Sequence, residues 1–316
     1  MYISDRKTSD FLSQLALVIL PWLGIAWGAW GWILEVVLLL SVLWIGKSKG
    51  LLTSVLLLSM GYLAALVYYG APAFLEIGYV PFAGLAINFG RSRSWPVKDL
   101  FFMGLVAAGL LGALPTIYLA RVGVDPQLAD SIVNTTIEQY KAAGMLSAMQ
   151  EQGVNEVQLR SYMRIALNYY FLLIPALVTL INFIKFGLVY LLFTRLFPEP
   201  GGGGTSFSRW QLPWYAVWGA ILGLALYLIG DEYNLLAYKN LGLNLILVYA
   251  GLALVLGISI YTFFLRNTKL PLLFKWIMIV GSFLYLQFSM LTLILFGLFD
   301  LVFNFRRLPD NGKEGS

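Results

Sequence analysis

Residues 241–265, LGLNLILVYAGLALVLGISIYTFFL, form an uninterrupted apolar run without a single charged side chain. An α-helix of this length is about 37 Å long, which is enough to cross a hydrocarbon core of roughly 30 Å. The apolar residues do not alternate with a period of two, so the run does not have the pattern of a barrel strand. Because a helix satisfies its own backbone hydrogen bonds in lipid, the run predicts a transmembrane helix.

Similar runs recur along the chain. Of its 316 residues, 59% are hydrophobic and 12% are charged, whereas a soluble domain has roughly 25% charged residues. We therefore predict an all-α, polytopic transmembrane helical bundle with about eight to ten transmembrane helices and both termini in the cytoplasm. The first run, Phe11 to Ala29, has no small-residue cleavage site after it, so we interpret it as an uncleaved helix.

The absence of cysteine and histidine excludes several classes of function. Disulfides, thiol nucleophiles and the usual zinc and haem ligands are all ruled out. We expect no metal, no cofactor and no enzymatic activity, although an intramembrane mechanism based on lysine or carboxylate stays open as a third hypothesis. The net charge of +5 comes from basic residues between apolar runs, so we expect no nucleic-acid partner.

The apolar runs predict an order of helices. The expected spans are 11–29, 32–45, 51–69, 73–89, 100–120, 165–194, 212–229 and 241–265, followed by two short helices within 270–305 that meet near Gln287 to Ser289. Asp99 is the expected cap of the fifth span, and Pro175 predicts a kink or tilt in the sixth.

Two polar segments divide the chain. Within the N-terminal part, 1–197, the segment 121–164 is predicted to form one or two amphipathic helices, starting at Asp125 and Pro126, on the outer membrane surface or over the mouth of the bundle. The glycine-rich stretch 198–208 predicts a cytoplasmic linker. A second membrane part, 209–308, and a polar tail, 309–316, follow.

The basic residues predict the orientation. With the N-terminus inside, fifteen of the 21 basic residues lie on the cytoplasmic side and five lie outside, in agreement with the positive-inside rule. The cytoplasmic set is Arg6, Lys7, Lys47, Lys49, Arg91, Arg93, Lys98, Arg195, Arg209, Arg266, Lys269, Lys275, Arg306, Arg307 and Lys313.

Polar side chains within the spans are the candidate site residues, because a charge at the bilayer centre costs about 3 kcal/mol or more unless it is paired or hydrated. The candidates for ligand binding are Glu76, Asn182, Lys185 and Asn244. For Glu76 and Lys185, structural pairing is the competing interpretation. Glu35 lies near an interface and is given no role. Structural or topological roles are assigned to Arg91, Arg93, Asp300, Arg306 and Arg307.

Small residues recur at four-residue spacing, and such patterns allow helices to approach closely. Internal packing is the first interpretation of Gly104, Ala108 and Gly112. A face that binds a partner helix is the alternative, and this run is its best candidate.

Short motifs carry a resemblance to a known family. They are Phe207, Trp210, Leu212 and Pro213, then Gly242, Asn244 and Leu245, then Gly297, Asp300 and Phe303 to Arg307, with Gly84 to Arg91 and Pro175 to Asn182 upstream. In these motifs the chain resembles the YybS-like family of bacterial polytopic membrane proteins of unknown function. The resemblance implies a fold similar to the substrate-capture subunits of energy-coupling-factor transporters. The first helix lacks the Ala-x-x-x-Ala pair with which many such subunits dock their transmembrane partner.

Two hypotheses of function follow. The first is a protein of the bacterial cytoplasmic (inner) membrane that binds or helps to transport a small solute, with a pocket that opens outward beneath segment 121–164. Its partners would be the lipid bilayer, the solute and a transporter energising module. The alternative is a membrane scaffold of the cell envelope that binds other membrane proteins and no ligand.

Overall fold

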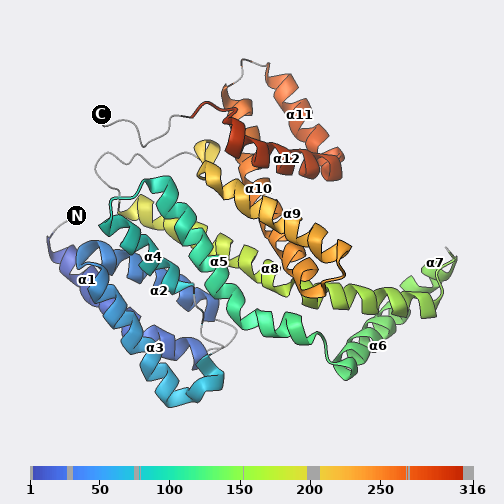
Figure 1. Ribbon diagram of the computed structural model, residues 1–316, viewed down its shortest axis with the longest axis horizontal. Coiled ribbons are helices and arrows are strands. Elements are labelled where there is room, and N and C mark those ends of the chain that lie inside the picture. The colour runs from blue at the N-terminus through green and yellow to red at the C-terminus, as the bar shows by residue number, and fades with distance from the viewer. Residues whose placement is uncertain are drawn as a thin grey trace.

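The computed structural model describes residues 3–26, 31–74, 78, 80–151, 153–197, 207–267, 269 and 271–308, and the regular structure within them is entirely helical (Figure 1). The helices of the N-terminal part are α1 (Ile3–Ala26), α2 (Gly31–Ser48), α3 (Leu51–Phe74), α4 (Pro81–Ser92), α5 (Val97–Val122), α6 (Pro126–Ala142), α7 (Met145–Glu151) and α8 (Glu156–Leu196). After two 3₁₀ turns, η2 (Phe207–Arg209) and η3 (Trp214–Ala216), come α9 (Val217–Glu232), α10 (Leu236–Asn267), α11 (Leu272–Leu284) and α12 (Leu286–Phe303).

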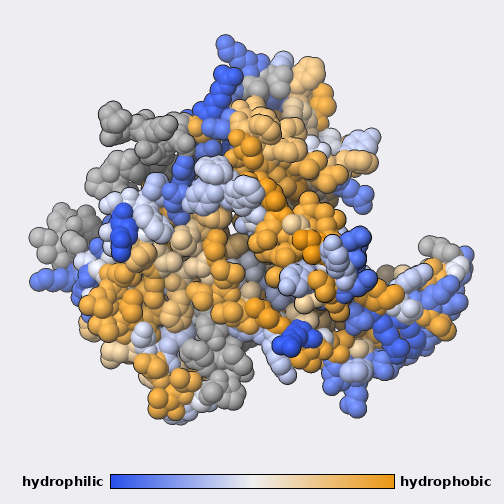
Figure 2. All heavy atoms as spheres, in the orientation of Figure 1, coloured by the Kyte–Doolittle hydropathy of each residue, from blue (hydrophilic) through white to orange (hydrophobic). Residues whose placement is uncertain are grey.

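Eight of the described helices are long and apolar enough to cross a membrane: α1, α2, α3, α5, α8, α9, α10 and α12. Large apolar side chains point away from the bundle, and Val67 on α3 is 85% exposed. Orange, hydrophobic side chains accordingly cover much of the bundle in Figure 2. In a bilayer this surface faces lipid, so the predicted all-α polytopic bundle is confirmed.

The fourth predicted span is wrong in its bounds. Helix α4 begins at Pro81, eight residues later than the expected start at 73, and ends at Ser92. The first residues of the expected span belong to α3, which continues past the non-helical Gly70 (φ 79°) to Phe74, and α4 starts at Pro81, a residue that favours the first turn of a helix. With its 12 residues, α4 is about 18 Å long and covers only part of the bilayer.

The last apolar region forms two helices, as predicted. The break falls at Tyr285, two residues before the expected turn, and it separates α11 from α12. Helix α11 has 13 residues and no buried side chain. The fifth span also differs in detail, because α5 begins at Val97, which places Asp99 in its first turn rather than at its cap.

One hydrophobic core holds α1 to α5 and α8 together. Phe186 and Phe193 of α8 are fully buried and pack with fully buried residues of α2 and α4, among them Leu39, Leu43 and Ile87. At one end of this core, Lys47 of α2 and Arg91 of α4 lie over the ring of Phe193. We call this end of the bundle the basic end. Helices α2, α4 and α8 all finish here, so their N-terminal ends point to the opposite side.

The C-terminal helices pack around α10. The backbones of α10 and α12 approach closely, because a Cβ atom on Gly257 would lie 2.0 Å from Leu293 O and one on Gly297 would lie 1.9 Å from Ala253 O. Glycine at both positions is therefore required for this crossing. Helix α10 also packs on α8, which joins the C-terminal helices to the rest of the bundle.

Segment 121–164 forms the expected amphipathic helices, and they build an arm that projects from the bundle at the right of Figure 1. Asp125 caps α6 by accepting hydrogen bonds from the backbone of Gln127 and Leu128. Helix α8 starts much earlier than predicted, at a capping box between Asn155 and Gln158. A small core of Val133, Ile137, Leu146 and Leu159 holds α6, α7 and the start of α8 together.

Candidate solute-binding cavity

A cavity of about 270 Å³ lies between α1, α2, α3 and α8. Its position follows from the helices, since Gly31 and Glu35 come from the first turns of α2, far from the basic end. The lining is Leu20, Pro21, Gly24, Ile25, Gly31, Trp32, Leu34, Glu35, Leu38, Tyr62, Gly78 and Lys185. The cavity therefore lies within the bundle, on the side away from the basic end.

An ion pair between Lys185 and Glu35 forms the polar centre of this cavity. Lys185 Nζ lies 2.6 Å from Glu35 Oε2, and the side chains are 21% and 12% exposed. The partners are 150 residues apart in sequence, and α8 and α2 bring them together. Because an unpaired charge in a membrane interior is costly, this pairing stabilises both charges, while their partial exposure keeps them accessible from the cavity.

The backbone at Gly78 closes one side of the cavity. Tyr62 of α3 donates a hydrogen bond from its hydroxyl group to Gly78 O. A Cβ atom at Gly78 would lie 1.0 Å from Glu35 Oε1, so only glycine fits against the carboxylate. Non-helical backbone at this depth occurs where it is buried in protein or lines a cavity, which is its position here.

Two predicted features concern this region, the role of Glu76 and the position of the pocket. Glu76, a predicted ligand-binding residue, lies outside the described residues. This cavity is not the pocket predicted beneath segment 121–164, because no described residue of that segment lines it. The physical reason is the length of α8, whose 41 residues hold the arm away from the bundle.

Asn182 does not join Lys185 in the cavity, although it lies one turn before it on α8. Its side chain is buried against α5, where a Cβ atom on Gly112 would lie 1.7 Å from Asn182 Nδ2. Thr179, one turn earlier, faces the same helix and donates to Gly109 O at 3.4 Å. The structure therefore places Asn182 in the contact between α5 and α8.

Asn244 also lies away from the cavity, and its three hydrogen bonds all go to backbone groups. Its Oδ1 accepts from Ala176 N at 3.0 Å, and its Nδ2 donates to Leu172 O and Asn240 O at 2.9 Å each. Residues 172 and 176 are spaced as partners in a regular helix, and Pro175 lies between them. Asn244 of α10 thus links α10 to α8 at the proline position, and its described hydrogen bonds are structural ones outside the cavity.

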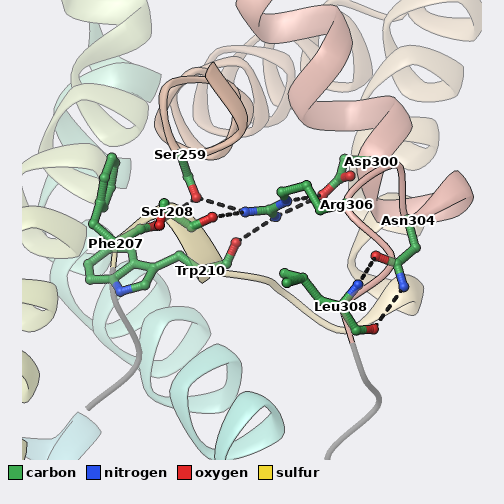
Figure 3. A network of polar contacts seen from close by, with 8 residues as sticks. All are labelled: Phe207, Ser208, Trp210, Ser259, Asp300, Asn304, Arg306 and Leu308. Atoms are coloured by element: carbon green, nitrogen blue, oxygen red, sulfur yellow. Dashed lines mark hydrogen bonds and ion pairs between the residues drawn. The ribbon is translucent and has the colours of Figure 1, made fainter. Parts of the chain in front are cut away.

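Arg306 and Asp300 form a second ion pair, buried near the end of the chain (Figure 3). Arg306 Nη2 lies 2.7 Å from Asp300 Oδ2, and Nε donates to the same oxygen at 3.0 Å. The remaining N–H groups donate to Ser208 O, Ser259 Oγ and Trp210 O at 2.7 to 3.0 Å. All five guanidinium donors are used. The pair connects the end of α12 to α10, to η2 and to Trp210 directly after η2.

The other residues assigned to structure or topology lie near aromatic rings or turns. The guanidinium of Arg91 is 4.8 Å from the centre of the Phe193 ring, and that of Arg93 is 5.3 Å from the Phe89 ring. Arg307 does not pair with Asp300. It has φ 50° in the turn after α12, and its backbone N–H donates to Asn304 O.

The small-residue run on α5 is used inside the protein. A Cβ atom on Gly104 would lie 2.1 Å from the ring of Phe186, and Ala108 is fully buried. Together with the contact between Gly112 and Asn182, these distances show that the run packs against α8. The alternative of a partner-binding face at Gly104 to Gly112 is therefore wrong.

Glu35 is the cavity residue that the sequence interpretation missed. Its position one turn from the end of an apolar run is typical of an interfacial carboxylate. A signal was nevertheless available, because Lys185 lies inside a span and needs a counter-charge. Among the acidic residues within spans, Glu35 was one of the few available partners.

The helices and the cavity define the class of this protein as a polytopic α-helical membrane protein. Residues 12–301 match the model of the family described as "Predicted membrane protein (DUF2232)", and the chain belongs to this family. The match runs through both the N-terminal and the C-terminal helices. Comparisons with curated proteins and with solved structures found no match.

Proposed function

We propose that this protein binds a small solute in the cavity between α1, α2, α3 and α8, as a step in its uptake across the bacterial cytoplasmic membrane. The observation that carries the proposal is the Lys185–Glu35 pair, which lines a cavity inside a membrane bundle. Ionisable residues within membrane spans commonly mark the paths of substrates and ions. The positive-inside rule assigns the basic end to the cytoplasm, so the cavity lies toward the outer side.

The sequence resemblance supports this proposal. The chain resembles the YybS-like family and, through it, the substrate-capture subunits of energy-coupling-factor transporters. Such subunits bind their solute without chemically changing it, and they depend on a separate energising module. By this analogy the protein is not an enzyme, and its partner is a membrane-associated ATPase module.

The test is solute-induced stabilisation of the purified protein, followed by obstruction of the cavity. A Cβ atom on Gly24 meets no atom within 4 Å, so Gly24→Leu adds a side chain at the cavity wall without a clash at its first atom. Gly281→Leu on α11 is the matched control, because Gly281 is equally free of contacts and lies outside the cavity.

A broad metabolite library is screened for a rise in Tm in detergent. We expect at least one solute to stabilise the wild type and Gly281→Leu but not Gly24→Leu. If no solute raises Tm, or if Gly24→Leu responds as the wild type does, the proposal fails.

The second candidate function is a scaffold, and the arm favours it. Helices α6 and α7 and the start of α8 form a folded unit outside the cavity, with blue, hydrophilic side chains in Figure 2. Ion pairs link its helices, including Arg164 with Asp130 and Lys141 with Glu156. The hydrogen bond to Glu138 raises the pKa of Lys141, so this lysine stays charged at neutral pH.

The scaffold function requires that the arm bind another protein. Val157 is 76% exposed on the arm, so Val157→Asp should disrupt such a contact without affecting the core. We expect a stable partner in gentle-detergent purifications of the wild type that is lost from this variant. A partner that remains bound to Val157→Asp excludes this exposed position as the contact.

A further inference from the structure

The charges in the cavity indicate which class of solute it takes, and this inference rests on the proposed function. Within the described lining there is one ammonium group, on Lys185, and one carboxylate, on Glu35, and they are bonded to each other at 2.6 Å. Both side chains are partly exposed. A solute that enters the cavity therefore meets a positive and a negative group side by side.

Charge balance distinguishes solutes with a single charge from solutes with both charges. A solute with only a carboxylate would compete for Lys185 and leave Glu35 without a counter-charge. A solute with only an ammonium group would leave Lys185 unpaired. Either result places an unpaired charge in a membrane interior, which is strongly unfavourable. A solute with both groups can replace each partner of the pair and leave every charge balanced.

We propose that the cavity binds a small zwitterion, with its ammonium group on Glu35 and its carboxylate on Lys185. In the bound state, two intermolecular ion pairs replace the single ion pair of the empty cavity. The cavity thus needs no further charged residue to hold a doubly charged solute.

The other residues that line the cavity indicate the size and polarity of the uncharged part of the solute. Apart from the ion pair, the side chains are mainly apolar, including Leu20, Ile25 and Leu38. The hydroxyl group of Tyr62 already donates to Gly78 O. A volume of about 270 Å³ is close to the lower end of ordinary ligand pockets, which begin at roughly 300 Å³. An amino-acid-sized zwitterion with an apolar side chain fits these properties.

The charge requirement is tested with probes that share the same apolar group and differ only in their charged groups. In the first set, leucine carries both charges, isoamylamine carries only the positive charge and 4-methylpentanoate carries only the negative charge. The fourth compound, 4-methylpentanamide, carries no charge. Phenylalanine, phenethylamine, 3-phenylpropionate and 3-phenylpropanamide form a second set with a larger body. Each probe is titrated against the full-length protein in nanodiscs, with Tm and direct binding as the two measurements.

We expect binding by the amino acid of at least one set and none by its singly charged or neutral analogues. Glu35→Gln and Lys185→Gln should each weaken that binding at least tenfold, because each leaves one solute charge unpaired. Arg164→Gln, on the arm, should bind as the wild type does. If a single substitution prevents folding, the exchanged variant Glu35→Lys with Lys185→Glu keeps the pair and should still bind the amino acid.

The outcomes distinguish this inference from the proposed function. Equal binding of the amine, the acid or the amide overturns the zwitterion assignment and leaves a solute-binding cavity. The same holds if only solutes of another class in the metabolite library bind and Gly24→Leu abolishes their binding. If no solute of any class binds, both proposals are overturned.

Discussion

Two ion pairs within the described part of the bundle, Arg306–Asp300 and Lys185–Glu35, differ in what surrounds them. Arg306 and Asp300 are only 5% and 2% exposed, and every guanidinium donor has a partner. Lys185 and Glu35 face a cavity, and among the described residues Lys185 makes one hydrogen bond, to Glu35. The comparison teaches that an intramembrane ion pair is structural when protein groups enclose it and bond every donor of its cation, and is available for a ligand when it faces open space.

Removal of the arginine from the buried pair should have the largest effect on stability. Arg306→Met leaves Asp300 buried without a counter-charge, which typically costs about 3 to 5 kcal/mol. We expect a large fall in Tm and in the yield of folded protein by size-exclusion chromatography. Arg306→Lys should also be destabilised, because lysine has three N–H donors and cannot replace five.

A double variant checks the reason for that loss. Arg306→Met combined with Asp300→Leu removes both charges, so it should recover part of the stability lost in Arg306→Met alone. A Tm for Arg306→Met within a degree or two of the wild type would contradict the structural role of this pair.

The loss of Asn244, an uncharged residue that bonds only backbone groups among the described residues, should have the next largest effect on stability. Asn244→Ala removes three hydrogen bonds and leaves the backbone at Leu172 and Ala176 without this partner. We expect a loss of about 1 to 2 kcal/mol in the free energy of unfolding. Unfolding of the purified protein by a denaturing detergent measures it.

The control places the same change in a Pro175→Ala background. An alanine at 175 restores an N–H group and a regular helix, so Asn244→Ala should then cost less. An equal cost in both backgrounds would show that Asn244 does not act through the proline position.

Lys185→Gln should affect solute binding more strongly than it affects the stability of the protein. Lys185→Gln leaves Glu35 without a counter-charge, but the pair is partly exposed to the cavity, so the loss of stability should be smaller than that of Arg306→Met. A variant that loses as much stability as Arg306→Met, or that keeps full solute response, would remove the distinction between the two pairs.

The smallest effect is expected on the arm. Arg164 and Asp130 are 60% and 53% exposed, and such pairs contribute little. Arg164→Ala should change the free energy of unfolding by at most about 0.5 kcal/mol, and this change should vanish at high salt. Thermal melts at low and high ionic strength measure it. A loss that persists at high salt would indicate a packing role for the arginine stem instead.

The spans could be predicted from the sequence because lipid imposes one local requirement, a long apolar helix. The run 241–265 lies inside α10, and Asp125 with Pro126 marked the start of α6 correctly. The break near Gly70 was expected, but the start of α4 was missed because the apolar run continues through residues 73 and 74, which belong to α3, and does not mark Pro81 as the first residue of the next helix.

The site was predictable only in part, because a polar residue within a span does not reveal what it faces. Lys185 and Asn182 are one turn apart on α8, yet one reaches the cavity and the other packs on Gly112. Asn244 has the composition of a ligand-binding residue, but its partners are backbone groups on another helix. Such pairings depend on the tertiary contacts, which one sequence does not give.

The continuous α8 has a mechanical consequence. This one helix contains part of the arm at its start, Pro175 at the position that Asn244 bonds and, ten residues later, Lys185. Ten residues of helix measure about 15 Å, so a change of about 10° in the helix direction at Pro175 would move the lysine backbone by about 2.6 Å. Because Asn244 of α10 bonds the backbone at Leu172 and Ala176, the packing of α10 helps to set this direction and, with it, the separation of Lys185 from Glu35.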